Sequence, residues 1–221
     1  MSKLQLLKAL IIFNSLLGFV LANDPDMLQD ICVANFNTGF KINGFPCKED
    51  ANVTAADFSF SGLASFVSVN KNNSLGSLVT PANVMKIPGL NTLGISLARI
   101  DFLRHGVNPP HTHPRASEII FVLDGELYVG FVTTANKLVS KTLKKGDVFV
   151  FPRGLLHFQR NTGNGTASVI AAFNSQLAGT QQMPAAMFAA QPEISDEILA
   201  TAFHIGTKAV KKIKFNFVTK K

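Results

Sequence analysis

The stretch "EIIFVLDGELYVGFV" at residues 118–132 contains two apolar runs that are separated by Asp124 and Gly125. Each run is short and rich in β-branched and aromatic residues, as is typical of a β-strand. An Asp-Gly pair favours a tight reversal, because glycine accepts the positive φ that such turns need. The stretch therefore predicts two antiparallel strands that are joined by a turn.

Similar apolar runs lie on both sides of this stretch. They are "LGISLARIDFL" (93–103), "KLVSKTL" (137–143), "DVFVF" (147–151) and "ASVIAAFNS" (167–175). Turn-forming residues separate them at 133–136, 144–146 and 161–165. Short strands at such regular spacing predict a mainly β protein, built as a sandwich or barrel of antiparallel strands.

The pattern changes after residue 184. The stretch "PEISDEILATAF" (192–203) has apolar residues at helical spacing, and Ser195 is placed to cap the start of a helix. A second, basic amphipathic stretch runs from 207 to 215. These features predict a small C-terminal α-helical arm beside the β core.

Four residues form a candidate metal site: His111, His113, Glu118 and His157. In an extended segment His111 and His113 point to the same face, because side chains alternate with a period of two. Glu118 begins the next strand and His157 belongs to a neighbouring run, so the four are expected to converge in an otherwise apolar interior. A chance pair of surface histidines is the alternative for His111 and His113.

The donor set limits the metal. Three imidazoles and one carboxylate leave two positions of an octahedron open, which suits Mn(II) or Fe(II). Zinc and copper bind such donors more tightly than manganese, so the donor types leave the choice open. The other two histidines, His105 and His204, are interpreted as ordinary surface or core residues.

The first 22 residues resemble a secretory signal. Lys3 and Lys8 precede an apolar run from Ala9 to Leu21, and cleavage is expected after Ala22. A membrane anchor is the alternative, but the run is interrupted by Asn14 and is shorter than the roughly 18 residues that a span needs. No later stretch is long and apolar enough to cross a membrane.

Other features agree with export. The two cysteines of the chain, Cys32 and Cys47, lie close together and predict one disulfide in an oxidising compartment, with two buried thiols as the alternative. Glycosylation sequons occur at Asn52, Asn72 and Asn164.

The formal net charge is +7, and loss of Lys3 and Lys8 with the signal leaves +5. Much of it lies at the end of the chain, in Lys208, Lys211, Lys212, Lys214, Lys220 and Lys221. The chain has no Trp and a single Tyr, and no aromatic residues alternate with these lysines, which argues against nucleic acid as a partner. A solvated helix face is expected, with acidic wall polymers as a conceivable contact.

Two segments carry a resemblance to a known family. The stretches "GVNPPHTHPRASE" (106–118) and "GDVFVFPRGLLHFQ" (146–159) closely resemble the two boxes of the germin and germin-like proteins, within the cupin superfamily. Further similarity in "NDPDMLQDICVA" (23–34), "NTLGISLARIDF" (91–102) and "FNSQLAG" (173–179) extends it over the mature chain. The resemblance implies a jelly-roll β-barrel, manganese held by the four residues, and export to the plant apoplast.

The resemblance also implies a homo-hexamer, built as a trimer of dimers and clasped by C-terminal helices. The expected organisation is a signal peptide at 1–22, a disulfide-containing segment at 23–60, a cupin β-barrel at 61–180 and an oligomerisation arm at 181–221.

The family includes oxalate oxidase and many superoxide dismutases. The oxidase is implied to hold its substrate with two asparagines beside the metal. Asn108 matches one of them, whereas the other position is Ala98, which cannot donate a hydrogen bond. A superoxide dismutase that produces hydrogen peroxide in plant defence is therefore the leading hypothesis.

Three alternatives remain from the sequence: an oxalate oxidase, a non-catalytic wall or receptor protein, and a nucleotide-sugar phosphodiesterase. The last lacks a phosphate-binding glycine loop in the sequence.

Overall fold

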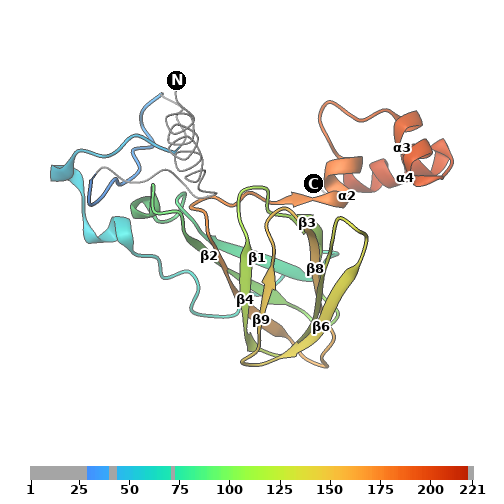
Figure 1. Ribbon diagram of the computed structural model, residues 1–221, viewed down its shortest axis with the longest axis horizontal. Helices are drawn as coiled ribbons and strands as arrows, with labels where there is room; N and C mark the ends of the chain where they lie inside the picture. The colour runs from blue at the N-terminus through green and yellow to red at the C-terminus, as the bar shows by residue number, and fades with distance from the viewer. Residues whose placement is uncertain (1–28, 40–43, 71–72, 219–221) are drawn as a thin grey trace, which may run out of the picture.

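The computed structural model describes residues 29–39, 44–70 and 73–218, and it consists of a β-barrel with one extension at each end (Figure 1). The predicted signal peptide, Asn72, Lys220 and Lys221 lie outside the described residues. Within these ranges no helix combines the length and hydropathy needed to cross a bilayer.

Two five-stranded antiparallel sheets form the barrel. The first sheet has the order β1-β2-β9-β4-β7, with strands at Ser77–Ala82, Ser96–Phe102, Ala167–Phe173, Glu118–Asp124 and Val148–Phe151. The second has the order β10-β3-β8-β5-β6, with strands at Gln181–Gln182, Val107–Thr112, Leu156–Asn161, Glu126–Val132 and Leu138–Lys144. The prediction of a mainly β protein, built from antiparallel strands, is confirmed.

The turn at Asp124 and Gly125 takes the chain from the first sheet to the second. Gly125 has φ +82°, and a Cβ there would lie 2.6 Å from the Cβ of Ala167, so glycine is required. The turns at 144–146 and 161–165 also change sheets, whereas the turn at 133–136 joins β5 and β6 as a hairpin. This alternation between sheets closes the barrel around one interior.

An apolar core lies in that interior. On β2 every second residue, namely Ala98, Ile100 and Phe102, points inward and is at most 4% exposed. Equivalent residues of other strands meet them, among them Ile120, Val122, Leu127, Val129, Leu143, Phe151, Val169 and Ala171. Burial of these side chains is the main stabilising term of the barrel.

Two strands and one α-helix were not predicted from the sequence. β1 contains Pro81, which is tolerated because this strand lies at the edge of its sheet. β10 has two residues, and α2 (Met183–Phe188) begins with a proline in its first turn.

The two predicted C-terminal helices are present as α3 (Asp196–Phe203) and α4 (Thr207–Val218). The Ser195 hydroxyl caps α3 by accepting from the backbone N–H of Ile198. Lys214 differs from the expected solvated face, because it is 9% exposed and lies 2.7 Å from Asp196 and 3.0 Å from Glu193. The ion pair of Lys214 with Asp196 holds α4 against the start of α3.

The N-terminal extension contains two 3-10 turns, η1 (Asp50–Asn52) and η2 (Ala55–Phe58), and a third, η3 (Pro88–Leu90), lies in the loop between β1 and β2. The Cys32–Cys47 disulfide is present and closes a separation of 15 residues. The buried amide of Asn91 donates to Cys32 Sγ and to the carbonyl of Phe45, and it accepts from Gln176. These bonds attach the extension to the loop that follows β9.

We expect the double variant Cys32→Ser with Cys47→Ser to lose about 3 kcal/mol of unfolding free energy, because a loop of this size then gains entropy in the unfolded chain. Thermal unfolding at matched protein concentration measures the loss. The unaltered protein in a reductant should unfold at the same temperature as the variant. Equal unfolding temperatures for variant and oxidised protein would contradict the expectation.

Candidate metal centre

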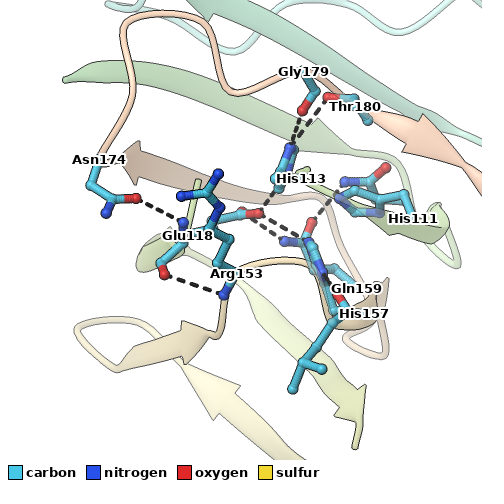
Figure 2. A network of polar contacts seen from close by, with 12 residues as sticks. His111, His113, Glu118, Arg153, His157, Gln159, Asn174, Gly179 and Thr180 are labelled. Carbon is cyan, nitrogen blue, oxygen red and sulfur yellow. Dashed lines mark hydrogen bonds and ion pairs between the residues drawn. The ribbon is translucent and has the colours of Figure 1, made fainter. Parts of the chain in front are cut away.

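The four predicted ligands meet inside the barrel. His111 lies on β3 and His157 on β8, where the two residues face each other in register, while Glu118 begins β4. One ligand atom from each of these three residues and one from His113 all lie within 4.8 Å of one another. Each of the four residues is at most 6% exposed. Figure 2 shows the four side chains pointing toward one point.

A backbone carbonyl fixes the tautomer of each imidazole. The Nδ1 atoms of His111 and His157 lie 2.8 Å from the carbonyl oxygens of Pro109 and Leu155, and Nδ1 of His113 lies 2.5 Å from that of Gly179. A carbonyl oxygen only accepts, so each Nδ1 carries the hydrogen. In the neutral form of each imidazole Nε2 then carries the lone pair, as a metal ligand requires.

These lone pairs face a carboxylate. Nε2 of His113 lies 2.9 Å and Nε2 of His157 lies 3.2 Å from Oε2 of Glu118. Acceptors this close repel one another unless a proton or a metal ion lies between them. The donor set therefore fits a cation, and its nitrogen and oxygen atoms without thiolate suit a hexacoordinate divalent metal.

Burial and the charges of neighbouring ligands shift the pKa values of the ligand side chains in different directions. Burial lowers the pKa of His111 to about 4, with repulsion from His157 adding to it. Burial also disfavours the charged form of His113, but the hydrogen bond and charge of Glu118 outweigh it and raise the pKa of His113. The pKa of Glu118 is lowered to about 2, because its bonds to His113 and His157 outweigh its burial.

A polar pair that supports Glu118 lies behind the ligands. Gln159 is fully buried, and its Nε2 donates to Oε1 of Glu118 at 3.2 Å. Its Oε1 accepts from the amide of Asn108 at 3.0 Å. Gln159 was not predicted as a site residue. Its position two residues after His157 on the same strand could have indicated it, because the two side chains point to the same face. Such bonds orient a metal ligand, and their loss typically lowers metal affinity 10- to 100-fold.

The loop between β3 and β4 is held from two sides. The backbone N–H of Arg153 donates to Ser117 Oγ, and its Nε donates to the carbonyl of Pro114. The backbone N–H of Ser117 donates to Asn174 at 2.7 Å. Figure 2 shows Arg153 and Asn174 on either side of Glu118. These bonds fix the chain between His113 and Glu118.

A cavity of about 440 Å³ opens onto the centre. Asn108, His111, His113 and Glu118 form its inner end. Its walls come from β1, β2 and the loop after β9. A molecule from solvent can therefore reach the ligand atoms.

The remaining candidate residues lie elsewhere. His105 and His204 are exposed turn residues with φ of 62° and 54°, and neither is part of the cluster. Asn52 lies in η1 and Asn164 in the turn between β8 and β9, and both are exposed. Their glycosylation stays a prediction.

At pH 6 the uptake of one Mn(II) by the apoprotein should release about one proton. The pKa of His113 is raised, mainly by its hydrogen bond with Glu118 against the effect of burial, so its imidazole tends to keep a proton that it must lose to bind a metal. His111 and Glu118 have a lowered pKa and contribute little. Affinity should accordingly fall up to about tenfold for each unit of further acidification.

Calorimetric titration in two buffers of different ionisation enthalpy measures the proton count. The count should decrease as the pH is raised, because less of the His113 imidazole is then charged. Release that is absent at pH 6, or that grows with pH, would contradict the assignment to His113.

The comparisons with known proteins agree with this geometry. The family model described as Cupin matches residues 65–211. Germin-like protein subfamily 2 member 4 of Arabidopsis thaliana is 61% identical over 208 residues, which cover 94% of each chain. Germin-like protein 5-1 of Oryza sativa subsp. japonica is 60% identical over 200 residues, which cover 90% of this chain and 89% of that one.

Among solved structures, a recombinant oxalate oxidase in complex with glycolate is 38% identical, with a TM-score of 0.85, and the match covers 90% of this chain and all of that one. The matched length includes both segments that carry the ligands. The chain therefore belongs to the germin-like proteins of the cupin family.

Proposed function

We propose that the protein is a secreted manganese superoxide dismutase of the plant apoplast, which produces hydrogen peroxide in defence. The observation that carries the proposal is the convergence of three Nε2 atoms and one carboxylate at the end of an open cavity. The nitrogen and oxygen donors are compatible with manganese, and the family resemblance favours it over other divalent metals. Secretion is supported by the disulfide and by the germin-like relatives.

The charge of the loaded site suits superoxide. A divalent ion that is held by three neutral imidazoles and the carboxylate of Glu118 leaves a single positive charge. A monoanion such as superoxide neutralises that charge, which lowers the cost of burying the anion. The net charge of +5 on the mature chain, from +7 less two signal lysines, also attracts small anions.

Manganese supplies the electron exchange when it is bound, because its +2 and +3 states are both accessible. One superoxide is oxidised to dioxygen, and a second is reduced and takes up two protons to give hydrogen peroxide. Gln159 holds Glu118 in place. The side-chain amide of Asn108 donates one hydrogen bond to Gln159. We assign the second N–H of the Asn108 amide to the anion in the cavity.

Inhibition of nitroblue-tetrazolium reduction by the purified, metal-quantified protein tests the proposal. Oxalate-dependent peroxide release is measured beside it on the same preparation. We expect superoxide consumption that scales with manganese content and little peroxide from oxalate. A manganese-loaded protein that leaves superoxide untouched would refute the dismutase.

Oxalate oxidation is the second candidate, because the 38% identical structure is named an oxalate oxidase. Ala98 argues against it, since this residue lines the cavity and offers no hydrogen bond. A non-catalytic wall or receptor protein is the third candidate, and failure of both assays would favour it.

We also propose a homo-hexamer that is assembled as a trimer of dimers. One support is an apolar band on the outer face of the first sheet, where Leu97, Ile119, Phe121, Val148 and Val150 are 43–52% exposed. Another is the arm formed by α2, α3 and α4, which reaches away from the barrel (Figure 1). Light scattering coupled to gel filtration should give the mass of six chains, and Phe121→Asp should lower it.

A further inference from the structure

The segment at 176–180, in the loop between β9 and β10, holds one of the metal ligands in place. Its Gly179 carbonyl accepts from Nδ1 of His113, and Figure 2 shows the two groups directed at each other. Residues 177–180 also form part of the cavity wall. The position of this segment therefore affects the orientation of the His113 imidazole.

Gln176 anchors the start of this segment through its side chain and its main chain. The backbone N–H of Thr92 donates to the side-chain oxygen of Gln176, and that of Val84 donates to its main-chain carbonyl. Nε2 of Gln176 donates to Oδ1 of Asn91 at 3.3 Å. Gln176 is 8% exposed and Asn91 is fully buried. A buried amide that loses its partner is left unsatisfied, which is costly, so displacement of one residue is expected to move the other.

Asn91 also contacts the disulfide of the N-terminal extension. Its Nδ2 lies 3.4 Å from Cys32 Sγ and 2.7 Å from the carbonyl oxygen of Phe45. Its Oδ1 accepts from the backbone N–H of Phe45 at 3.2 Å. Phe45 lies two residues before Cys47, so the disulfide helps to hold this stretch against Asn91. Direct contacts therefore connect the disulfide to Gln176 through Asn91.

The disulfide is open to attack from one side. Cys47 is exposed, whereas Cys32 is 5% exposed. A thiolate of a dithiol reductant can attack Cys47 Sγ and release Cys32 as a thiolate, which the Asn91 amide stabilises by donating to it. The second thiol of the reductant then displaces Cys47. Two electrons and two protons pass to the cysteines, which become thiols, and the reductant becomes a cyclic disulfide.

We propose that this disulfide and the metal centre are energetically coupled through Asn91 and Gln176, so that reduction of the disulfide weakens metal binding. Reduction frees the stretch that carries Phe45, and the Asn91 amide loses the fixed partners against which it is placed. Gln176 then holds the 176–180 segment less firmly, and the His113 imidazole is less well oriented for a metal. The coupling is reciprocal, because two linked equilibria change each other by the same factor. The proposal rests on the metal centre and not on the dismutase reaction.

Manganese affinity with and without the disulfide tests the coupling. The variant Cys32→Ser with Cys47→Ser cannot form the disulfide and contains no thiol that could itself bind a metal. The electron paramagnetic resonance signal of free Mn(II) gives the Kd of each protein, at a temperature well below its unfolding transition. We expect the variant to bind Mn(II) about tenfold more weakly than the oxidised unaltered protein, at the low end of the effect of residues that orient metal ligands. Equal affinity would overturn the proposal.

The reverse effect is measured on the unaltered protein in buffers of reduced and oxidised dithiothreitol. Alkylation followed by mass measurement gives the reduced fraction, and the chain has no further cysteine to disturb the count. We expect saturating Mn(II) to lower the equilibrium constant for reduction by the same factor, about tenfold. An equilibrium constant that does not respond to Mn(II) would contradict the coupling.

Gln176→Glu tests the route. It keeps an oxygen that can accept from Thr92 and replaces the Nε2 donor with an oxygen that cannot donate to Asn91. The ratio of Mn(II) affinities with and without the disulfide should fall from about ten to about one in this background. Asp57→Asn is the matched control, because it weakens an ion pair within the extension, which Asp57 forms with Lys48 at 2.7 Å, and leaves the Asn91 bonds in place.

Asp57→Asn should lower stability and keep the ratio of affinities. A ratio that persists in Gln176→Glu would refute the route through Asn91 and Gln176. Superoxide consumption is measured on the same oxidised preparations. Coupled metal binding by a protein without dismutase activity would refute the dismutase alone. Dismutase activity with equal affinities in the oxidised protein and the cysteine-free variant would refute the present inference alone.

Discussion

Substitution of His157 by alanine should reduce the manganese content of the purified protein to less than a tenth of its normal value. Its Nε2 is one of four ligand atoms, and loss of a direct ligand is expected to exceed the 10- to 100-fold effect of a supporting residue. The melting temperature should fall as well, because a bound metal stabilises the native state. Elemental analysis and thermal unfolding measure the two effects.

The ring of His157 also stacks on Phe151 at 4.5 Å, so alanine leaves a void in the core. His157→Gln keeps most of the volume and separates loss of the ligand from loss of packing. His105→Asn is the matched control, because it removes an exposed imidazole and asparagine tolerates the positive φ of that turn. Full manganese occupancy in His157→Gln would refute the four-ligand centre.

Ala98→Asn should raise oxalate turnover by about 10- to 100-fold over the low level expected of the unaltered protein. Ala98 lines the cavity and lies beside small neighbours, Ala171 and Pro81, in adjacent strands. A new amide can donate to a carboxylate there, and a hydrogen bond to a charged group contributes about 1.5 to 3 kcal/mol. Asn108 would provide the second contact.

Ala98→Leu is the matched control, since leucine has nearly the shape of asparagine but cannot donate. We expect no gain in oxalate turnover from it. Peroxide release from oxalate, normalised to manganese content, measures both variants. Vigorous oxalate oxidation by the unaltered protein would overturn the significance given to Ala98.

The ligand set could be predicted because local rules determine it. His111 and His113 are two residues apart in an extended segment, and Glu118 follows after one short turn, so neither inference needed long-range information. The place of His157 depended on the assumption that its run is a neighbouring strand. The register of β3 and β8 pairs it directly with His111.

Other features of the fold depend on tertiary packing, which the local sequence does not specify. The turn at Asp124 and Gly125 predicted a reversal, but whether the strands then pair or part depends on closure of the whole barrel. Gln159 resembles a surface residue in the sequence and is buried by the packing of the two sheets. Lys214 likewise belongs to a basic helix face, and the return of α4 onto the start of α3 buries it. Tertiary packing determined each outcome.

The carbonyl groups that hold Nδ1 of His111, His113 and His157 belong to the main chain, at Pro109, Gly179 and Leu155. Main-chain atoms are unaffected by side-chain replacement, so the orientation of the imidazoles does not depend on which residues form the cavity walls. Evolution can therefore alter Val79, Ala98 or Phe173 while the candidate metal centre persists. Such separation of reactivity from selectivity makes the scaffold evolvable, and it allows new specificities to be engineered by changing the walls alone.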